Sequence, residues 1–472
     1  MALTSFSFFT FFLIVFIGCL IFENNNRQKK LLLLVVSYYF YMTIDWRFPL
    51  LLLALTFINY YIGSYILKEK RIAVKRWLVI IAVTLSLSIL FYFKYANFFI
   101  ESITELLNFG FIDRENPIIK VVLPVGISFM TFQAITYPID IYTGKLTKRA
   151  TIIDFSLFMA FFPQLLSGPI VRASYFLPQL NNNEGFNGKN IFEGIGLILR
   201  GIIKKVIFAD ILAMHIVDPA FNNPSSFSSA FLLVAIIAFS FQVYMDLSGY
   251  TDIALGTGKI LGYKLPINFN RPYLATSIAN YWQRWHISMS SFFRDYLYEA
   301  IAPLKFGNIY SKLIIVFIAI GLWHGAGWNF ILYGLIHGML VGFEHYKKNI
   351  RLRVGESLIV YRGFKLFLRI IQVFLIISFT RILFRGSSLE ESINYFTELF
   401  TSEGTGFPLS WIAGIVLALA VLLHIVPLRF RDWLTDSVSR LPSVITAGIT
   451  VLFIYVLTAF SSDNSSFIYF QF

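Results

Sequence analysis

Charged residues are scarce in this sequence, and cysteine is almost absent. Asp, Glu, Lys and Arg make up 14% of its 472 residues, whereas a soluble globular protein contains about 25%. So little charge cannot cover a water-facing surface of this size, which argues against a chain of ordinary soluble domains. The single cysteine, Cys19, excludes an internal disulfide and any metal site built on a cysteine pair.

Apolar residues dominate instead: they make up 57% of the chain and include 52 phenylalanines. They form runs that no long polar stretch separates. These runs cover residues 3–22, 31–44, 49–67, 77–93, 118–141, 152–166, 191–216, 226–247, 313–323, 328–343, 364–384, 410–426 and 444–460. We therefore predict an all-α polytopic membrane protein, one membrane body without a separate soluble domain, with about 11 to 13 membrane segments. Several runs are shorter than the roughly 20 residues of a full span, which predicts half-spans or re-entrant pieces.

The net charge of +13 comes from short basic clusters that lie between the apolar runs. This spacing is typical of cytoplasmic loops, so we expect the lipid bilayer, and no nucleic acid, as a partner. The first run lacks the preceding positive charge and the cleavage site of a signal peptide, which predicts a retained span with an extracytoplasmic N-terminus. Basic clusters at 68–76, 145–149, 200–205, 347–353 and 429–440 predict cytoplasmic loops, and acidic residues within 101–115 and 390–403 predict outside loops.

One histidine stands between two short apolar runs. His324 lies in the sequence Gly-Leu-Trp-His-Gly-Ala-Gly-Trp, and Lys312 and Lys347 flank the two runs. If both lysines are cytoplasmic, the chain enters the membrane and returns, and His324 lies roughly 18 Å deep, about twelve helical residues from Lys312. An ionisable group at that depth indicates function; the alternative is a packed histidine that donates to a carbonyl. The glycines on both sides would let a substrate approach the backbone.

A second histidine lies in the least hydrophobic segment, residues 246–307. Within it, residues 277–298 have the pattern of an amphipathic interfacial helix with Ser277 as its N-cap. His286 follows Trp285 in this helix. Its aromatic and polar neighbours favour the lining of a cavity; the alternative is an incidental histidine on an interfacial helix.

Two histidines inside a membrane suit acyl transfer. A neutral imidazole takes the proton of a hydroxyl as the oxygen attacks a carbonyl, which contributes about 10²–10⁴-fold in rate. The developing oxyanion needs hydrogen-bond donors, for which we predict the backbone amides of residues 325–327 or the side chain of Asn329. A metal site is not expected, because no His-Glu-x-x-His sequence occurs and His324 and His337 would point in different directions on one helix.

Other polar residues fit either a supporting or a structural role. Asp246 and Asp252 lie at the end of an apolar run. They are expected to orient a histidine, to line a polar entrance or to form a hydrogen-bonded turn. Arg172 either meets a phosphate or is a positive-inside arginine. Ser248 has a turn-like setting but no Gly-x-Ser-x-Gly nucleophile elbow. Of the remaining histidines, His337 and His345 are expected to be packing or interfacial residues, and His215 and His424 to be structural.

Several short sequences occur in an order typical of one family. They are SGPI at residues 167–170, YMDLSGYTDIA at 244–254, LPINF at 265–269, YWQRWHIS at 281–288, RDYLY at 294–298 and GLWHGA at 321–326. In this order they resemble the membrane-bound O-acyltransferase family, and within it the bacterial branch that O-acetylates cell-surface polysaccharides. The resemblance is strongest over residues 120–345. One departure is segment 299–308, which lacks a glycine pair that relatives often carry there.

The resemblance implies a ring of tilted, partly re-entrant helices around a central cavity or tunnel. It implies three parts: N-terminal spans at 1–117, a catalytic core at 118–345 and C-terminal spans at 346–472. It identifies His324 as the family's essential histidine and His286 as its second characteristic polar residue. Trp285 and Trp323, which neighbour these histidines in the sequence, are expected to support them.

The same resemblance implies an O-acetyltransferase in the bacterial cytoplasmic membrane. An acetyl group from a cytoplasmic donor, acetyl-coenzyme A in this branch, would move toward a cell-envelope polysaccharide or peptidoglycan without a metal. A separate extracytoplasmic acetyltransferase partner would complete transfer to the polymer. Alternatives are transfer of D-alanine toward teichoic acid in a related branch and, from another class, a transporter or flippase, although the sequence shows no internal repeat of the kind that transporters often have.

Overall fold

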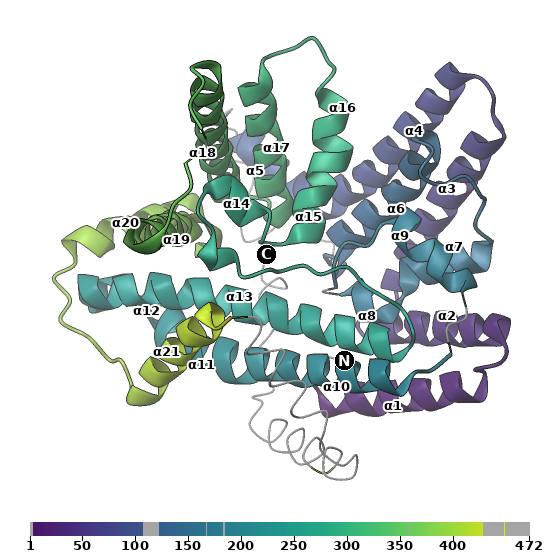
Figure 1. The fold of residues 1–472 in the computed structure, drawn as a ribbon, viewed down its shortest axis with the longest axis horizontal. Coiled ribbons are helices and arrows are strands. Elements are labelled where there is room, and N and C mark those ends of the chain that lie inside the picture. Colours follow the sequence, from purple (N-terminus) through teal and green to yellow (C-terminus); the bar gives the residue numbers. More distant parts are fainter. Residues whose placement is uncertain are drawn as a thin grey trace. The chain divides into compact units, whose positions relative to one another are not determined.

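The structure is a computed structural model that describes residues 3–106, 122–166, 168–182, 185–357, 359–427 and Gly448. Within these residues the secondary structure is helical, apart from one isolated bridge between Phe227 and Gly406 (Figure 1). The all-α prediction is therefore confirmed for the described part of the chain. Most of the predicted span at 444–460, the basic cluster at 429–440 and part of the acidic loop at 101–115 lie outside the described residues.

The helices form two compact units. The first, here called the N-terminal unit, contains Met1–Ile198 and Thr251–Pro266. The second, the C-terminal unit, contains Leu199–Tyr250 and Ile267–Phe472. These units do not follow the three-part division that the resemblance implies. That division concerns catalysis rather than packing, and it stays a prediction.

The N-terminal unit is built from apolar helices. Its elements are α1 (Phe6–Ile21), α2 (Asn26–Met42), α3 (Phe48–Lys68), α4 (Ile72–Leu90), η1 (Phe91–Tyr95), α5 (Ala96–Leu106), α6 (Ile127–Tyr142), α7 (Ile152–Ala160), α8 (Phe162–Leu165), α9 (Ala173–Phe176), η2 (Leu177–Asn181) and most of α10 (Gly188–Ile202). α6 packs against α3 and α4. Large rings fill these contacts, since Tyr137 of α6 lies 4.5 Å from Phe155 of α7 between ring centroids. Gly63 of α3 leaves the space that the Tyr137 ring occupies.

The C-terminal unit holds both candidate histidines. Its elements are η3 (Ile203–Ala209), α11 (Asp210–Leu212), η4 (Ala213–Val217), α12 (Asp218–Asn222), η5 (Pro224–Ser226), the first part of α13 (Ser229–Ile260), η6 (Pro272–Leu274), α14 (Ile278–Trp282), α15 (Ile287–Phe292), η7 (Phe293–Tyr298), α16 (Glu299–Ile301), α17 (Ile309–His324), α18 (Trp328–Arg353), α19 (Gly363–Arg385), α20 (Leu389–Thr401) and α21 (Trp411–Ile425). α18 packs against both α17 and α19, and these three helices carry most of the residues around His324.

Four helices in the described part of the chain are long and apolar enough to cross a membrane. They are α3, the continuous helix 72–106, α13 and α19. The apolar helices α1, α17 and α21 are shorter, at 10–17 residues. The uneven lengths agree with the prediction of a polytopic membrane protein in which some segments do not span the bilayer alone.

Helix α13 corrects one prediction. The sequence indicates an apolar run that ends at residue 247, and a hydrogen-bonded turn is one of the alternatives for Asp246 and Asp252. In the structure α13 continues unbroken from Ser229 to Ile260, so that alternative is wrong. The reason is close helix packing, because a Cβ atom at Gly249 would lie only 2.8 Å from the carbonyl oxygen of Gly201. Gly249, which resembles a turn signal in the sequence, instead allows two helical segments to approach closely.

Candidate active site

His324 is the last residue of α17, at the tip of a helical hairpin. α17 and α18 pack against each other as antiparallel neighbours joined by residues 325–327 (Figure 1). A capping box between Asn308 and Ser311 fixes the start of α17. The turn-back of the chain at His324, which the sequence predicts, is therefore present.

The glycines of this hairpin make room for protein rather than for a substrate. A Cβ atom at Gly321 would lie 2.1 Å from the carbonyl oxygen of Phe330 in α18. A Cβ atom at Gly334 would lie 2.3 Å from the carbonyl oxygen of Phe317, and one at Gly325 would meet the ring of Phe330. The prediction that Gly321 and Gly325 leave space for a substrate is therefore wrong. Their role is to let the two helices approach closely.

His324 is 2% exposed and is enclosed by aromatic rings from three helices. Its ring centroid lies 4.9 Å from that of Trp323 on α17, 5.0 Å from that of Phe384 on α19 and 6.3 Å from that of Tyr333 on α18. Such rings keep bulk water away from the imidazole. In a low-dielectric pocket of this kind, a hydrogen bond to a bound polar group is stronger than in water.

Trp323 joins the two predicted histidines. Besides its contact with His324, its ring meets that of His286 edge to face, with centroids 5.4 Å apart and planes at 88°. Three residues that the sequence singles out therefore lie together, although His286 and His324 belong to different elements. Of the residues predicted for the site, Trp323 thus contacts both histidines.

The segment that carries His286 is not the continuous helix that the sequence predicts from Ser277 onward. Ser277 caps α14 as expected, but the helix then stops and restarts as α15. The cause is Asn268, whose carbonyl oxygen accepts the N–H of Ile287 at 2.8 Å and whose side chain accepts the N–H of Ser288 at 3.0 Å. These two N–H groups would otherwise bond to carbonyls one turn earlier, so the helix breaks in front of them.

His286 occupies the break in an unusual backbone conformation. Its φ of 43° and ψ of 54° lie in the left-handed region, which costs a residue with a Cβ about 1–2 kcal/mol. We expect His286→Gly to unfold at a higher temperature than His286→Ala, with a free energy of unfolding greater by about 1 kcal/mol. Thermal unfolding in detergent micelles measures the difference.

The control for that comparison is Ser291, which lies in regular α15. There the alanine variant should be the more stable of the pair, by up to about 1 kcal/mol, because glycine weakens a helix interior. If both positions follow the helix order, the left-handed conformation at His286 does not contribute to stability.

The imidazole of His286 is neutral. The residue lies outside the four candidate spans, and burial lowers its pKa to about 3. A neutral imidazole offers one donor and one acceptor nitrogen, so it can accept a proton or orient a hydroxyl.

Trp285 leads to a residue that the sequence analysis missed. Its ring stacks on that of Tyr281, with centroids 5.7 Å apart, and the guanidinium of Arg381 lies 4.3 Å from its ring centroid. Arg381 belongs to α19, within the predicted apolar run at 364–384. A third basic residue inside such a run, after Lys365 and Arg369, was the available signal, since charges in a membrane segment are costly.

The predicted oxyanion donors are partly engaged. The side-chain amide of Asn329 donates to the carbonyl oxygens of Leu383 at 3.1 Å and Gly386 at 2.8 Å, so it fastens α18 to the end of α19. The N–H of Gly325 donates to the carbonyl of Gly321 at 3.3 Å. Asn329 would have to give up a bond to serve as a donor, which shifts the prediction toward the amides of residues 326 and 327.

The predicted carboxylates and Arg172 are divided between the two units of the chain. Asp246 lies in α13, where the ammonium of Lys205 pairs with it at 2.8 Å and with Asp210 at 2.8 Å. Asp252 and Arg172 belong to the N-terminal unit. Their roles as supporting residues stay predictions, and Ser167 of the SGPI sequence lies outside the described residues.

The C-terminal helix α21 supports the same segment from a distant part of the sequence. Arg271, also left-handed at φ 47°, donates through Nε to the carbonyl oxygen of His424 at 3.1 Å and bonds to that of Ile425. The N–H of Tyr273 donates to Nε2 of His424 at 3.2 Å. A guanidinium on the last carbonyls caps α21, and His424 has the structural role that the sequence predicts.

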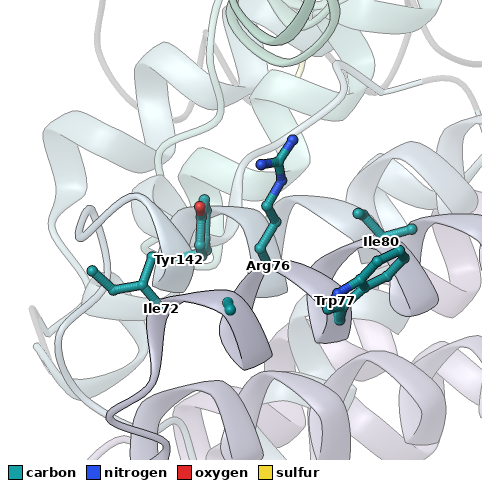
Figure 2. A pocket seen from close by; sticks show the side chains of 6 residues that line it. Ile72, Arg76, Trp77, Ile80 and Tyr142 are labelled. Atoms are coloured by element: carbon teal, nitrogen blue, oxygen red, sulfur yellow. The ribbon is translucent and has the colours of Figure 1, made fainter.

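A separate groove of about 570 Å³ opens in the N-terminal unit (Figure 2). It is lined by Ile72, Ala73, Arg76, Trp77 and Ile80 of α4 and by Tyr142 of α6. None of the predicted site residues is among them. The central cavity or tunnel that the resemblance implies therefore stays a prediction.

Comparison with known proteins extends these observations. Residues 31–384 match the membrane-bound O-acyltransferase family. This range includes both histidines, Trp323 and Arg381, and it ends at Phe384 beside the His324 ring.

Several individual proteins that are similar to this chain are named as acyl-transfer enzymes. A Pseudomonas aeruginosa protein named probable alginate O-acetylase AlgI is 38% identical over 308 residues, which cover 63% of this chain and 58% of that protein. A peptidoglycan O-acetyltransferase of Helicobacter pylori is 37% identical over 320 residues, covering 62% and 59%. A teichoic acid D-alanyltransferase of Streptococcus thermophilus is 30% identical over 231 residues, covering 46% and 55%. The chain thus matches less than two thirds of the length of each of these relatives.

Proposed function

The chain belongs to the membrane-bound O-acyltransferase family, and from this premise we propose that it transfers an acetyl group from a cytoplasmic donor toward a cell-envelope polysaccharide or peptidoglycan. The observation that carries the proposal is the contact of His286, Trp323 and His324 within the residues that match the family. The similarity to an alginate O-acetylase and a peptidoglycan O-acetyltransferase supports acetyl as the group and a glycan as the acceptor.

In the proposed reaction His324 is the general base. Its imidazole accepts the proton of an acceptor hydroxyl while that oxygen attacks the thioester carbonyl carbon of acetyl-coenzyme A. The tetrahedral intermediate then collapses, the carbon–sulfur bond breaks, and the imidazolium returns its proton to the thiolate. The products are an O-acetyl ester and the free thiol of coenzyme A. The backbone amides of residues 326 and 327 are the proposed donors to the oxyanion.

His286 has a complementary role in the proposal. It is neutral and buried, and its ring contacts that of Trp323, as the ring of His324 does. It can hold the acceptor hydroxyl by a hydrogen bond while His324 removes the proton. Trp285 and Trp323 would fix the two imidazoles by packing rather than by chemistry.

We place the protein in the bacterial cytoplasmic membrane with its N-terminus outside. A core at residues 118–345 would form a cavity in which His324 lies deep, reached by the donor from the cytoplasm. Arg172 and Asp252 are proposed to line the donor entrance, where a guanidinium suits the phosphates of coenzyme A. A separate extracytoplasmic acetyltransferase would pass the group on to the polymer.

The identity of the transferred group is open to a direct test. With the gene present, we expect alkali-labile O-acetyl esters on envelope glycans and no change in ester-linked D-alanine. Membrane vesicles supplied with radiolabelled acetyl-coenzyme A should release its thiol and retain the label. The relative from Streptococcus thermophilus makes D-alanine the second candidate. A gene-dependent change in D-alanine esters without O-acetyl esters would replace acetyl by D-alanyl in the proposal, and donor-independent uptake of a solute would favour a transporter.

A further inference from the structure

A cation lies buried near the C-terminal end of a candidate membrane span. Arg381 of α19 is 2% exposed. Within the described part of the chain its partners are neutral: Nη1 donates to the carbonyl oxygen of Ser240 at 2.9 Å and to the hydroxyl of Tyr273, and Nη2 donates to the hydroxyl of Tyr281 at 2.8 Å. No carboxylate there forms an ion pair with it. Burying a charge without an opposite charge costs much free energy, so the presence of Arg381 at this position needs a physical reason.

The contacts of Arg381 converge on the segment that precedes His286. Its guanidinium lies 4.3 Å from the ring centroid of Trp285, a cation–π contact that is strongest when water is excluded. It also bonds to Tyr281, whose ring stacks on the same Trp285 at an angle of 16°. Arg381 thus contacts Trp285, the residue next to His286, directly through its guanidinium and indirectly through Tyr281.

The residue before Arg381 acts on the same segment. Thr380 contacts Nε2 of His337 at 3.0 Å, and the indole N–H of Trp282 donates to Nδ1 of His337 at 3.2 Å. An indole N–H can only donate, so Nδ1 is the acceptor and Nε2 carries the proton. Since the Thr380 hydroxyl donates to the carbonyl of Ile377 at 2.9 Å, it is free to accept from Nε2. Two successive residues of α19 therefore fix Trp282, the last residue of α14, and Trp285, which lies within the helix break.

We infer that Arg381 is a positioning residue for acyl transfer: acting through Trp285, it holds His286 in its left-handed conformation against Trp323. This inference rests on the proposed function of the two histidines. The helix break needs such support, because the left-handed conformation is unfavourable by itself. Only a planar guanidinium can lie over an indole while it donates to two hydroxyls and a carbonyl in different directions.

The test compares two arginines of the same helix. Arg385 lies one turn beyond Arg381, where it pairs with Asp218 at 3.0 Å and has no contact with the segment around Trp285. We expect Arg381→Met to lower kcat about 10- to 100-fold, because a small misplacement of a reacting group is enough for such a loss. KM for acetyl-coenzyme A should change less than about threefold, because donor binding is not what the residue supports. Arg385→Met should leave both constants within about threefold of the wild type, since a change that does not move the reacting groups leaves the transition state unaffected.

Two further variants keep the test valid if Arg381→Met folds poorly. Arg381→Lys retains the charge but not the planar stack, and we expect it to recover only part of the lost kcat. Trp285→Leu removes the ring on which Arg381 acts, so it should lower kcat as Arg381→Met does, and the two changes together should lower it no further.

A readout that does not depend on activity separates this inference from the proposed function. Diethyl pyrocarbonate modifies accessible imidazoles, and mass spectrometry of the peptide that contains His286 reports the rate at that residue. We expect slow modification in the wild type and in Arg385→Met, and faster modification in Arg381→Met. Protection of His286 equal to the wild type in Arg381→Met, or a normal kcat in that variant or in Trp285→Leu, would overturn the inference. Failure of the wild type to transfer acetyl from any donor would overturn the proposed function alone, since the labelling still reports whether Arg381 positions His286.

Discussion

Replacing His324 with alanine is expected to lower acetyl transfer by about 10²–10⁴-fold, the range that a general base contributes. His324 is at the tip of the α17–α18 hairpin, enclosed by the rings of Trp323, Tyr333 and Phe384. Among these rings, a water molecule cannot act as the base as effectively as the imidazole of His324 does. The measurement is the rate of thiol release from acetyl-coenzyme A in membrane vesicles, normalised to the amount of folded protein.

A second substitution separates chemistry from packing. His324→Ala leaves a cavity among rings, which by itself destabilises the fold by up to several kcal/mol, roughly as large-to-small core changes do. His324→Gln fills more of the space but cannot act as a base near pH 7, so it should lose as much rate with a smaller loss of stability. His345→Ala is the matched control, because His345 is a half-buried residue of α18 whose ring meets Asn349 at 3.1 Å. Near-normal transfer by folded His324→Gln would falsify the role assigned to His324.

Adding one methyl group to α18 at Gly334 is expected to destabilise the protein by about 1–3 kcal/mol, the usual cost of overpacking. A Cβ atom there would lie 2.3 Å from the carbonyl oxygen of Phe317 and 2.8 Å from the Cα of Ile318. Both contacts are with backbone, which cannot rotate away as a side chain can. Gly334→Ala should therefore force α17 and α18 apart and lower the unfolding temperature in detergent.

The same helix supplies the control. A Cβ atom at Gly342 would meet nothing closer than 3.9 Å, where it contacts Tyr310. Gly342→Ala should be neutral or should stabilise the protein by up to about 1 kcal/mol, since alanine is the better helix former. The two variants differ only in position along α18, so the difference isolates the cost of separating the hairpin. If Gly334→Ala is as stable as Gly342→Ala, the close approach of α17 and α18 is not a source of stability.

Loss of activity should accompany the loss of stability at Gly334. His324 is on the helix that would move, and its contact with Trp323 and the Trp323 contact with His286 depend on the position of α17. Acetyl transfer by Gly334→Ala should fall by more than its folded fraction explains.

The hairpin at His324 was predictable because its determinants are local. Two short apolar runs separated by glycines require the chain to reverse, and the lysines at their far ends indicate that both runs start on one side. The role of the glycines was not predictable in the same way. Whether Gly321 admits a substrate or the carbonyl of Phe330 depends on how closely α18 approaches, which sequence spacing does not define.

The break at His286 could not be predicted, because its cause is distant in sequence. Every local feature after Ser277 favours a helix, but the backbone and side chain of Asn268 accept the N–H groups at which α15 begins. Sequence patterns report what a segment prefers alone, and here tertiary hydrogen bonds override that preference. α13 shows the converse case, since Gly249 favours a turn locally and is retained in a helix by packing against Gly201.

Arg381 was missed for a different reason. It lies in a run that is largely apolar, and averaging the hydropathy over the run hides the few charges in it. The two histidines were found because each has aromatic neighbours within its own short sequence. The partners of Arg381 are instead spread over Ser240, Tyr273 and Tyr281, so only the folded chain shows what it contacts.

The part of the chain that matches the family ends at Phe384, but residues after it also form hydrogen bonds that support the candidate site. The carbonyl groups that receive Arg271 and the imidazole that receives the N–H of Tyr273 belong to α21, at the far end of the described C-terminal residues. The end of the sequence similarity therefore separates the segment that carries His286 from α21, the helix to which Arg271 and Tyr273 are bonded. A chimera that exchanges everything after residue 384 for the corresponding part of a relative would keep every recognisable sequence of the family. It would still have to rebuild the attachment of Arg271 and Tyr273 before the segment that carries His286 could hold its shape.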